Sequence, residues 1–234
     1  MKHLFLRSGV VLIFFCLLVL PSEARSKKDK STGNLLTTQW GIGLNASTFG
    51  LGGEIIKGLG PKFDIRAGYS TMNLNLKYNL DLEGTAVQLF GNINPGGPHL
   101  LFNFNLSPGF HLTLGAALNQ TVVLVSAQSL SNVPVEDIFV LPGDFGFIEM
   151  ILLPRIKVSP YAGIGFGRTL SRDKRFSFSF DLGTYYQSSP SASLLGAGML
   201  SPTVSDHNVF VLNSLIKPYR WWPVLSAQLS YRIL

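Results

Sequence analysis

The chain has 234 residues, of which 46% are apolar and only 14% charged, and its formal net charge is +6. This composition is too apolar for a disordered chain and too poor in charge for a typical soluble domain. The length suits one sizeable domain. The single cysteine, Cys16, excludes a disulfide scaffold and a zinc site built on cysteines. The longest apolar run, Val10–Leu20, has eleven residues, fewer than the ~20 that a membrane-spanning helix needs. An apolar chain of this kind, rich in Gly and Phe, favours strands.

The first 24 residues have the three parts of a secretory signal. Basic residues Lys2 and Arg7 precede the apolar run, and a small-x-small exit ends at Ala24. We expect cleavage after Ala24, which removes residues 1–24 together with the cysteine. A membrane anchor is the alternative, and the short apolar run disfavours it.

A polar N-terminal tail follows the signal at residues 25–38. Several basic residues gather there, and the sequence pI is about 9.5. We predict no nucleic-acid binding, because exported proteins rarely meet nucleic acid and no basic stripe runs through the rest of the chain.

From Gln39 to the end of the chain, apolar and polar residues alternate in short runs that are separated by Gly, Pro, Asn and Ser. Phe176–Leu182 and Met72–Leu82 are the clearest examples. A period of two is typical of strands with one apolar face. The predicted strands, in chain order, are 39–46, 48–57, 62–74, 82–106, 109–126, 147–159, 160–170, 175–187, 191–199 and 223–233.

Two architectures produce this alternation. A soluble sandwich or barrel turns its apolar face inward, whereas an outer-membrane barrel turns it toward lipid. The polar phase carries enough charge to line a lumen, and the total charge is low for a face exposed to water. Aromatic residues gather near the predicted strand ends, where membrane barrels have interfacial girdles: Trp40, Tyr69, Tyr161, Tyr185, Tyr186, Tyr219, Trp221 and Trp222.

We therefore predict an all-β fold for residues 39–234: an antiparallel up-and-down transmembrane β-barrel of eight to ten strands in the outer membrane of a Gram-negative bacterium. Ten strands fit better, because four short connections then lie on one side and two long ones, 127–146 and 200–222, on the other. A short helix is expected at 205–217. The soluble alternative would instead bury Phe176, Phe178 and Phe180.

Six charged residues in the polar phase are the predicted lumenal charges: Asp64, Arg66, Lys77, Asp81, Asp181 and Arg232. Two interpretations stay open. Buried charges must pair or they destabilise a fold, so the six residues form either a salt-bridged plug or the charge ladder of a narrow pore.

Four segments carry a resemblance to a known family. Pro160–Arg168 reads PYAGIGFGR, Phe178–Pro190 contains FSFDLG and QSSP, Leu101–Gly115 ends in FHLTLG, and Trp222–Tyr231 reads WPVLSAQLSY. They resemble the PYxGIGFGR, F(D/E)LGxxxQGSP, LLxDxxPxxxxFHLTxG and YPVLSLGLSY motifs of small outer-membrane β-barrel proteins common in Bacteroidetes-type bacteria. The resemblance implies a small barrel of uncharacterised activity, remotely similar to porins.

The chain departs from that family at a few positions. Asn105 stands where the family often has Asp, and Ser189 replaces a Gly. Such barrels usually end in an aromatic residue that the outer-membrane assembly machinery recognises, whereas this chain ends in Ile233-Leu234.

No catalytic constellation, metal site or cofactor site stands out in the sequence. His111 lies in the polar phase, where Asp64 or Asp181 could be near it, and a lumenal histidine of this kind is usually a hydrogen-bonded filler. We expect a monomeric, non-enzymatic protein with a structural, membrane-stabilising or loop-display role. Its partners would be the lipid bilayer and the assembly machinery. A small-solute porin is the alternative, and a lumenal outer-membrane enzyme is the third candidate.

Overall fold

The structure of the chain is a computed structural model that describes residues 39–82, 85–135 and 138–233. The predicted signal (1–24) and polar tail (25–38) lie outside the described residues. Within these described ranges, no helix is both long enough and apolar enough to cross a membrane.

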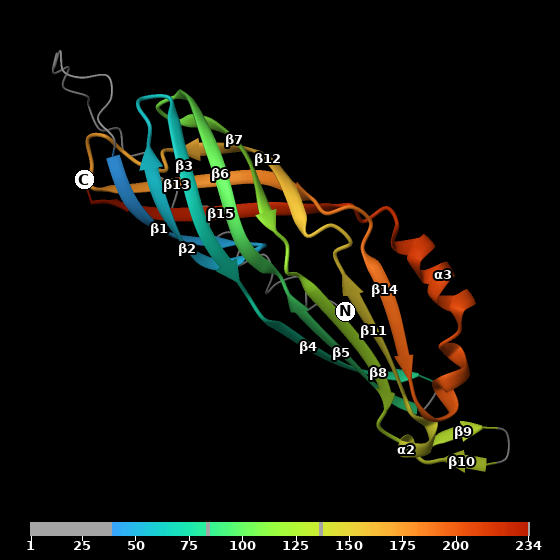
Figure 1. The fold of residues 1–234 in the computed structure, drawn as a ribbon. Helices are drawn as coiled ribbons and strands as arrows, with labels where there is room; N and C mark the ends of the chain where they lie inside the picture. The colour runs from blue at the N-terminus through green and yellow to red at the C-terminus, as the bar shows by residue number, and fades with distance from the viewer. Residues whose placement is uncertain (1–38, 83–84, 136–137, 234) are drawn as a thin grey trace. The chain divides into compact units, whose positions relative to one another are not determined.

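Eight strands among the described residues close into an antiparallel barrel (Figure 1). Each strand has 9 to 12 residues, and the first strand pairs with the last to close the ring. The strands are β1 (Gln39–Ser47), β2 (Gly50–Gly58), β3 (Phe63–Thr71), β6 (Gly96–Ser107), β7 (Phe110–Leu118), β12 (Val158–Gly167), β13 (Phe176–Tyr186) and β15 (Trp221–Arg232).

A second, five-stranded sheet is built from the long connections between barrel strands. We call it the extension sheet, and its strands are β4 (Leu74–Leu82), β5 (Thr85–Asn94), β8 (Val122–Ser129), β11 (Phe147–Leu153) and β14 (Ser191–Gly196). Its order, β14-β11-β8-β5-β4, repeats the order β13-β12-β7-β6-β3 of the barrel strands to which its members are joined. Because barrel neighbours are antiparallel, all three long connections leave the barrel at one end, and the short ones after β2, β6 and β12 lie at the other.

The remaining elements follow the extension strands. They are a hairpin of β9 (Val133–Val135) and β10 (Ile138–Val140), the short helix α2 (Pro142–Phe145), the 3-10 helix η1 (Gly198–Thr203) and the helix α3 (Asp206–Ile216). Ser205 caps α3, since its hydroxyl accepts a hydrogen bond from the backbone N–H of Asn208 at 3.2 Å. The helix expected at 205–217 is therefore confirmed.

The preference for ten barrel strands was wrong, since eight strands close the barrel in the described part of the chain. The predicted strands 147–159 and 191–199 fall mainly on β11 and β14, and the alternating run Met72–Leu82 belongs to β4. The boundary predicted between strands 147–159 and 160–170 lies inside β12. Alternation shows that a strand has one apolar face, and it does not show to which sheet the strand belongs.

The barrel has its apolar face outside and its polar face inside. On β13, Phe176 and Phe178 are 64% and 57% exposed, whereas Ser177, Ser179 and Asp181 are buried. The other barrel strands repeat this pattern with few exceptions. A soluble barrel requires the reverse, so the soluble alternative does not describe this fold.

A bend at the start of β6 joins the extension sheet to the barrel. Gly96 and Gly97 have φ of 148° and 143°, in the region that favours glycine. A side chain on Gly97 would collide with the carbonyl oxygen of Leu118 at the end of β7. The chain therefore needs glycine where β5 passes into β6.

We predict that Gly97→Ala destabilises the barrel by about 1–3 kcal/mol, because it combines a strained φ with a backbone collision. The measurement is the temperature at which the folded form disappears on a gel of unheated and heated samples in detergent. Gly109→Ala is the control, because a methyl group there would meet no atom within 4 Å. Equal unfolding temperatures for the two variants would contradict the role assigned to Gly97.

Candidate functional site

A buried arginine crosses the middle of the barrel interior. Arg66, on β3, is 2% exposed. Its Nη1 donates hydrogen bonds to Oδ2 of Asp181 on β13 at 3.0 Å and to Oε1 of Gln228 on β15 at 2.6 Å. This single guanidinium therefore connects three strands through the lumen.

Glu54, on β2, is the second carboxylate of this centre. Its Oε1 accepts from Nδ2 of Asn45 at 2.7 Å and lies 3.0 Å from Nε2 of His99. Its Oε2 accepts from Nε2 of Gln228 at 2.9 Å and lies 3.9 Å from Nε of Arg66. The carboxylate thus has polar partners on both oxygens.

Asp181 also has polar partners on its second carboxylate oxygen, Oδ1. Its Oδ1 lies 2.8 Å from Nε2 of His111 and accepts from Thr113 Oγ1 at 3.2 Å. The opposite ring nitrogen of His111 lies 3.2 Å from the carbonyl oxygen of Gly167. A side chain at Gly165 would overlap the His111 ring and the Asp181 carboxylate. The glycine at that position of the GIGFG run makes room for this pair.

The network continues toward the end of the barrel with the short turns. The Thr113 hydroxyl also lies 3.1 Å from Oδ1 of Asn103, whose amide donates to Thr169 at 2.9 Å. Thr169 in turn donates to Oδ2 of Asp64, and Asn105 donates to the same oxygen at 2.7 Å. Polar side chains therefore fill the lumen from the central arginine to this end.

Apolar residues close both ends of this polar core. Leu170, in the connection after β12, is buried, and a methyl on Gly41 would meet its Cδ1 at 2.6 Å. At the other end Phe49, in the turn after β1, packs on Tyr185, which packs on Tyr161, with ring centroids 4.8 Å apart in each pair. A cavity of about 20 Å³ remains beside the aromatic rings, roughly the space that one water molecule needs.

The structure brings together half of the predicted lumenal charges. Asp64, Arg66 and Asp181 lie inside the barrel. Arg232 lies at the rim, where its Nη1 donates to the carbonyl oxygens of Ser171 and Arg172 in the connection after β12. The prediction was wrong for Lys77 and Asp81, which are exposed on β4 of the extension sheet, because the run that contains them leaves the barrel.

Sequence reasoning missed Glu54 and His99. Glu54 follows Gly50, Gly52 and Gly53 and shares its strand face with Ile56, so the alternation does not mark that face as polar. His99 follows Pro95-Gly96-Gly97-Pro98, a sequence typical of a loop, and the backbone bend there allows β6 to begin at Gly96. His99 shares a strand face with the odd-numbered residues of Leu101–Asn105. The alternation of that segment could therefore have placed His99 on the inner face.

The arrangement binds its own charges rather than a ligand. Each of the three lumenal carboxylates is hydrogen-bonded to other side chains, and the space left beside them holds about one water. Among the described residues, no group of three or more His, Cys, Asp or Glu could hold a metal ion. Within the described residues, paired charges and amides thus occupy the inside of the barrel.

The chain matches no protein-family model, and no curated protein is similar to it in sequence. Its structure is similar to that of Acinetobacter baumannii CarO2, with a TM-score of 0.58 and 18% identity over 86% of this chain and 100% of that chain. Acinetobacter baumannii CarO gives a TM-score of 0.56 and 18% identity over 85% and 99%. At this identity the similarity shows the fold alone. The chain has the closed antiparallel fold of outer-membrane β-barrel proteins.

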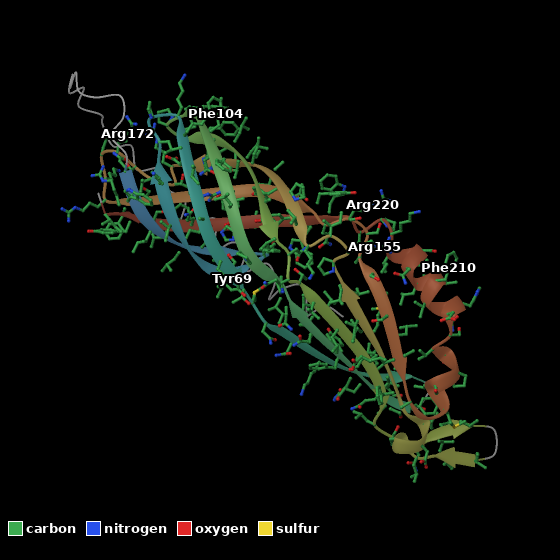
Figure 2. The ribbon with its side chains drawn as sticks, viewed as in Figure 1. Tyr69, Phe104, Arg155, Arg172, Phe210 and Arg220 are labelled. Atoms are coloured by element: carbon green, nitrogen blue, oxygen red, sulfur yellow. The ribbon has the colours of Figure 1, made fainter. Side chains whose placement is uncertain are left out.

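We predict that Arg66→Ala destabilises the barrel by about 3–5 kcal/mol, because Glu54 and Asp181 then face each other without the cation between them. Urea unfolding of the protein in detergent measures the change. Arg155→Ala is the control. Arg155 is exposed and lies outside the strands (Figure 2), so its loss should change stability by less than about 0.5 kcal/mol. A loss for Arg66→Ala no larger than that of the control would show that the plug does not depend on this residue.

Proposed function

We propose that the protein is an outer-membrane β-barrel whose lumen is plugged and whose role is structural, membrane-stabilising or the display of its long connections. The observation that carries the proposal is the inverted polarity of the barrel together with its filled interior. Apolar side chains face outward, and paired charges and amides occupy the inside. A lipid environment stabilises apolar side chains on the outside of the barrel. A filled interior requires no transport role.

The barrel surface has the features of a membrane-spanning band. Strands of 9 to 12 residues suit a tilted crossing of the hydrocarbon core. At one end exposed Trp221 packs edge to face against Tyr186, with ring centroids 4.9 Å apart. At the other end Trp40 lies beside Lys57, whose Nζ is 4.9 Å from the ring centroid. Aromatic rings at both ends of the apolar band support an interfacial girdle at each membrane surface.

The long connections support the display role. In barrels of this class the short turns face the periplasm and the long loops face outward. The extension sheet, the β9–β10 hairpin and α3 would then be exposed outside the cell. The bilayer and the assembly machinery are the partners this role requires, and each chain closes its own barrel, which supports a monomer.

We also infer kinship with the small barrels of Bacteroidetes-type bacteria. The motif segments fall on the barrel strands β6, β7, β12, β13 and β15. Within them, Gly165 and Asp181 serve the lumenal plug. The motifs therefore match requirements of the barrel interior rather than of a reaction.

We predict that Leu114→Arg impairs barrel formation. Leu114 lies in the centre of β7 and is 63% exposed on the outer face, and an arginine at the bilayer midplane costs about 2–4 kcal/mol. Outer membranes are run unheated and heated on detergent gels to measure the folded fraction. Phe139→Arg, on the β10 hairpin where Phe139 is 74% exposed, is the matched control. Recovery of wild-type protein from the soluble periplasmic extract would refute the membrane location.

Conductance separates the plugged barrel from the small-solute porin. In a planar bilayer the purified protein should give no stepwise current in potassium chloride, because packed side chains occupy the lumen. Currents that shift in ion selectivity with Asp181→Asn would instead favour the porin. A gel showing that the inserted protein remains folded is the control for a silent membrane.

A further inference from the structure

An apolar cavity of about 360 Å³ lies between helix α3 and one face of the extension sheet. The sheet contributes residues of β8, β11 and β14, among them Ala127, Met150 and Leu194. The helix contributes Leu212 and Leu215. We propose that this cavity is a binding site for a small, uncharged hydrocarbon molecule presented from the outer side of the barrel, a function independent of the role proposed above.

Polar contacts attach the helix to the edge of the sheet, beside partly buried apolar residues of the helix such as Leu212 and Ile216. Asn213 of α3 accepts a hydrogen bond from the backbone N–H of Ala192 on β14 at 3.0 Å and donates to its carbonyl oxygen at 3.2 Å. This pair attaches α3 to the edge strand. No residue of α3 is buried, and Leu215 is 67% exposed although it lines the cavity. The apolar side chains therefore surround the space without filling it.

The lining is matched to an uncharged occupant. Its one polar residue is Asn208, and the Nδ2 of Asn208 already donates to the carbonyl oxygen of Thr203 at 2.8 Å. No charged side chain lines the cavity. A bound carboxylate or ammonium group would lose its hydration there with no partner in return. A hydrocarbon loses nothing of this kind and gains from leaving water.

On the face that α3 covers, apolar residues lie side by side across the sheet: Val125 is paired with Met150, and Ala127 with Ile148. The neighbouring residue Gln128 points to the opposite face, where it donates to Gln88, which in turn donates to Asn79 across three strands. That opposite face carries these amides together with exposed apolar side chains, among them Phe147, Leu153 and Leu195. The space that is left between α3 and the sheet is the one that we assign to the hydrocarbon ligand.

The size of the cavity sets the size of the ligand. The cavity opens to solvent beside Leu215, which is 67% exposed, and pockets for small ligands start at about 300 Å³. At about 360 Å³ the site accommodates a fused aromatic ring system or an alkyl chain. A second copy of this chain is the competing occupant, and it is distinguished below.

The test uses the full-length protein in amphipol with the neutral dye 1-aminoanthracene, whose fluorescence rises in apolar sites. We expect saturable binding that decanol displaces better than decanoate. Ala127→Phe fills the cavity from β8 and should weaken binding by about tenfold or more. Gln128→Phe places the same ring on the opposite face and should leave affinity within about twofold. A detergent gel shows that both variants are folded, and Ala127→Leu replaces Ala127→Phe if that variant is not.

Three results would overturn the proposal. Equal dye binding by wild type, Ala127→Phe and Gln128→Phe would place the dye in the amphipol. Stronger displacement by decanoate than by decanol would show that the site prefers an anion. A dimer by light scattering that Ala127→Phe dissociates, without saturable dye binding, would make a second copy the occupant. None of these results bears on the gel and conductance tests of the barrel itself.

Discussion

The pairing of Arg66 with Glu54 and Asp181 is the interaction on which the barrel depends. A guanidinium placed inside a barrel is stable only with counter-charges, and here they come from Glu54 of β2 and Asp181 of β13, with Gln228 of β15 bridging Arg66 and Glu54. The arginine itself is on β3. Two strands from the first part of the chain and two from its last part are thus fixed around one cation. The same interaction explains why the lumen is closed, because the charges bind one another across it.

Small residues on the inner face make this packing feasible. An eight-stranded barrel has an interior just wide enough for side chains, so large residues on one strand require glycine on another. Gly165 makes room for His111 and Asp181, and Gly68 does so for Glu54 and His99. The closing residues Phe49 and Leu170 come from turns at opposite ends of the barrel. The plug is therefore built by strands and turns together.

The extension sheet changes the polarity of the strand faces. Along β7 the odd-numbered residues His111 and Thr113 are polar and face the lumen, whereas Val125 and Ala127 further along the chain line the apolar cavity under α3. In the barrel, apolar side chains suit the lipid side. Beyond it the apolar face is the one that the helix covers. The surroundings of the chain therefore change from β7 to β8. This change accounts for both the apolar outer face of the barrel and the proposed hydrocarbon site.

The sequence by itself determined which residues share a strand face, and through their polarity that Asp64, Arg66 and Asp181 lie on an inner surface. Alternation is a local property, since successive side chains point to opposite faces. Only the tertiary structure decided that the strand of Lys77 and Asp81 leaves the barrel, that eight strands close it, and that His99 reaches Glu54. These features depend on which strands pair across the ring, and pairing between residues distant in sequence leaves no mark on the alternation of any one strand.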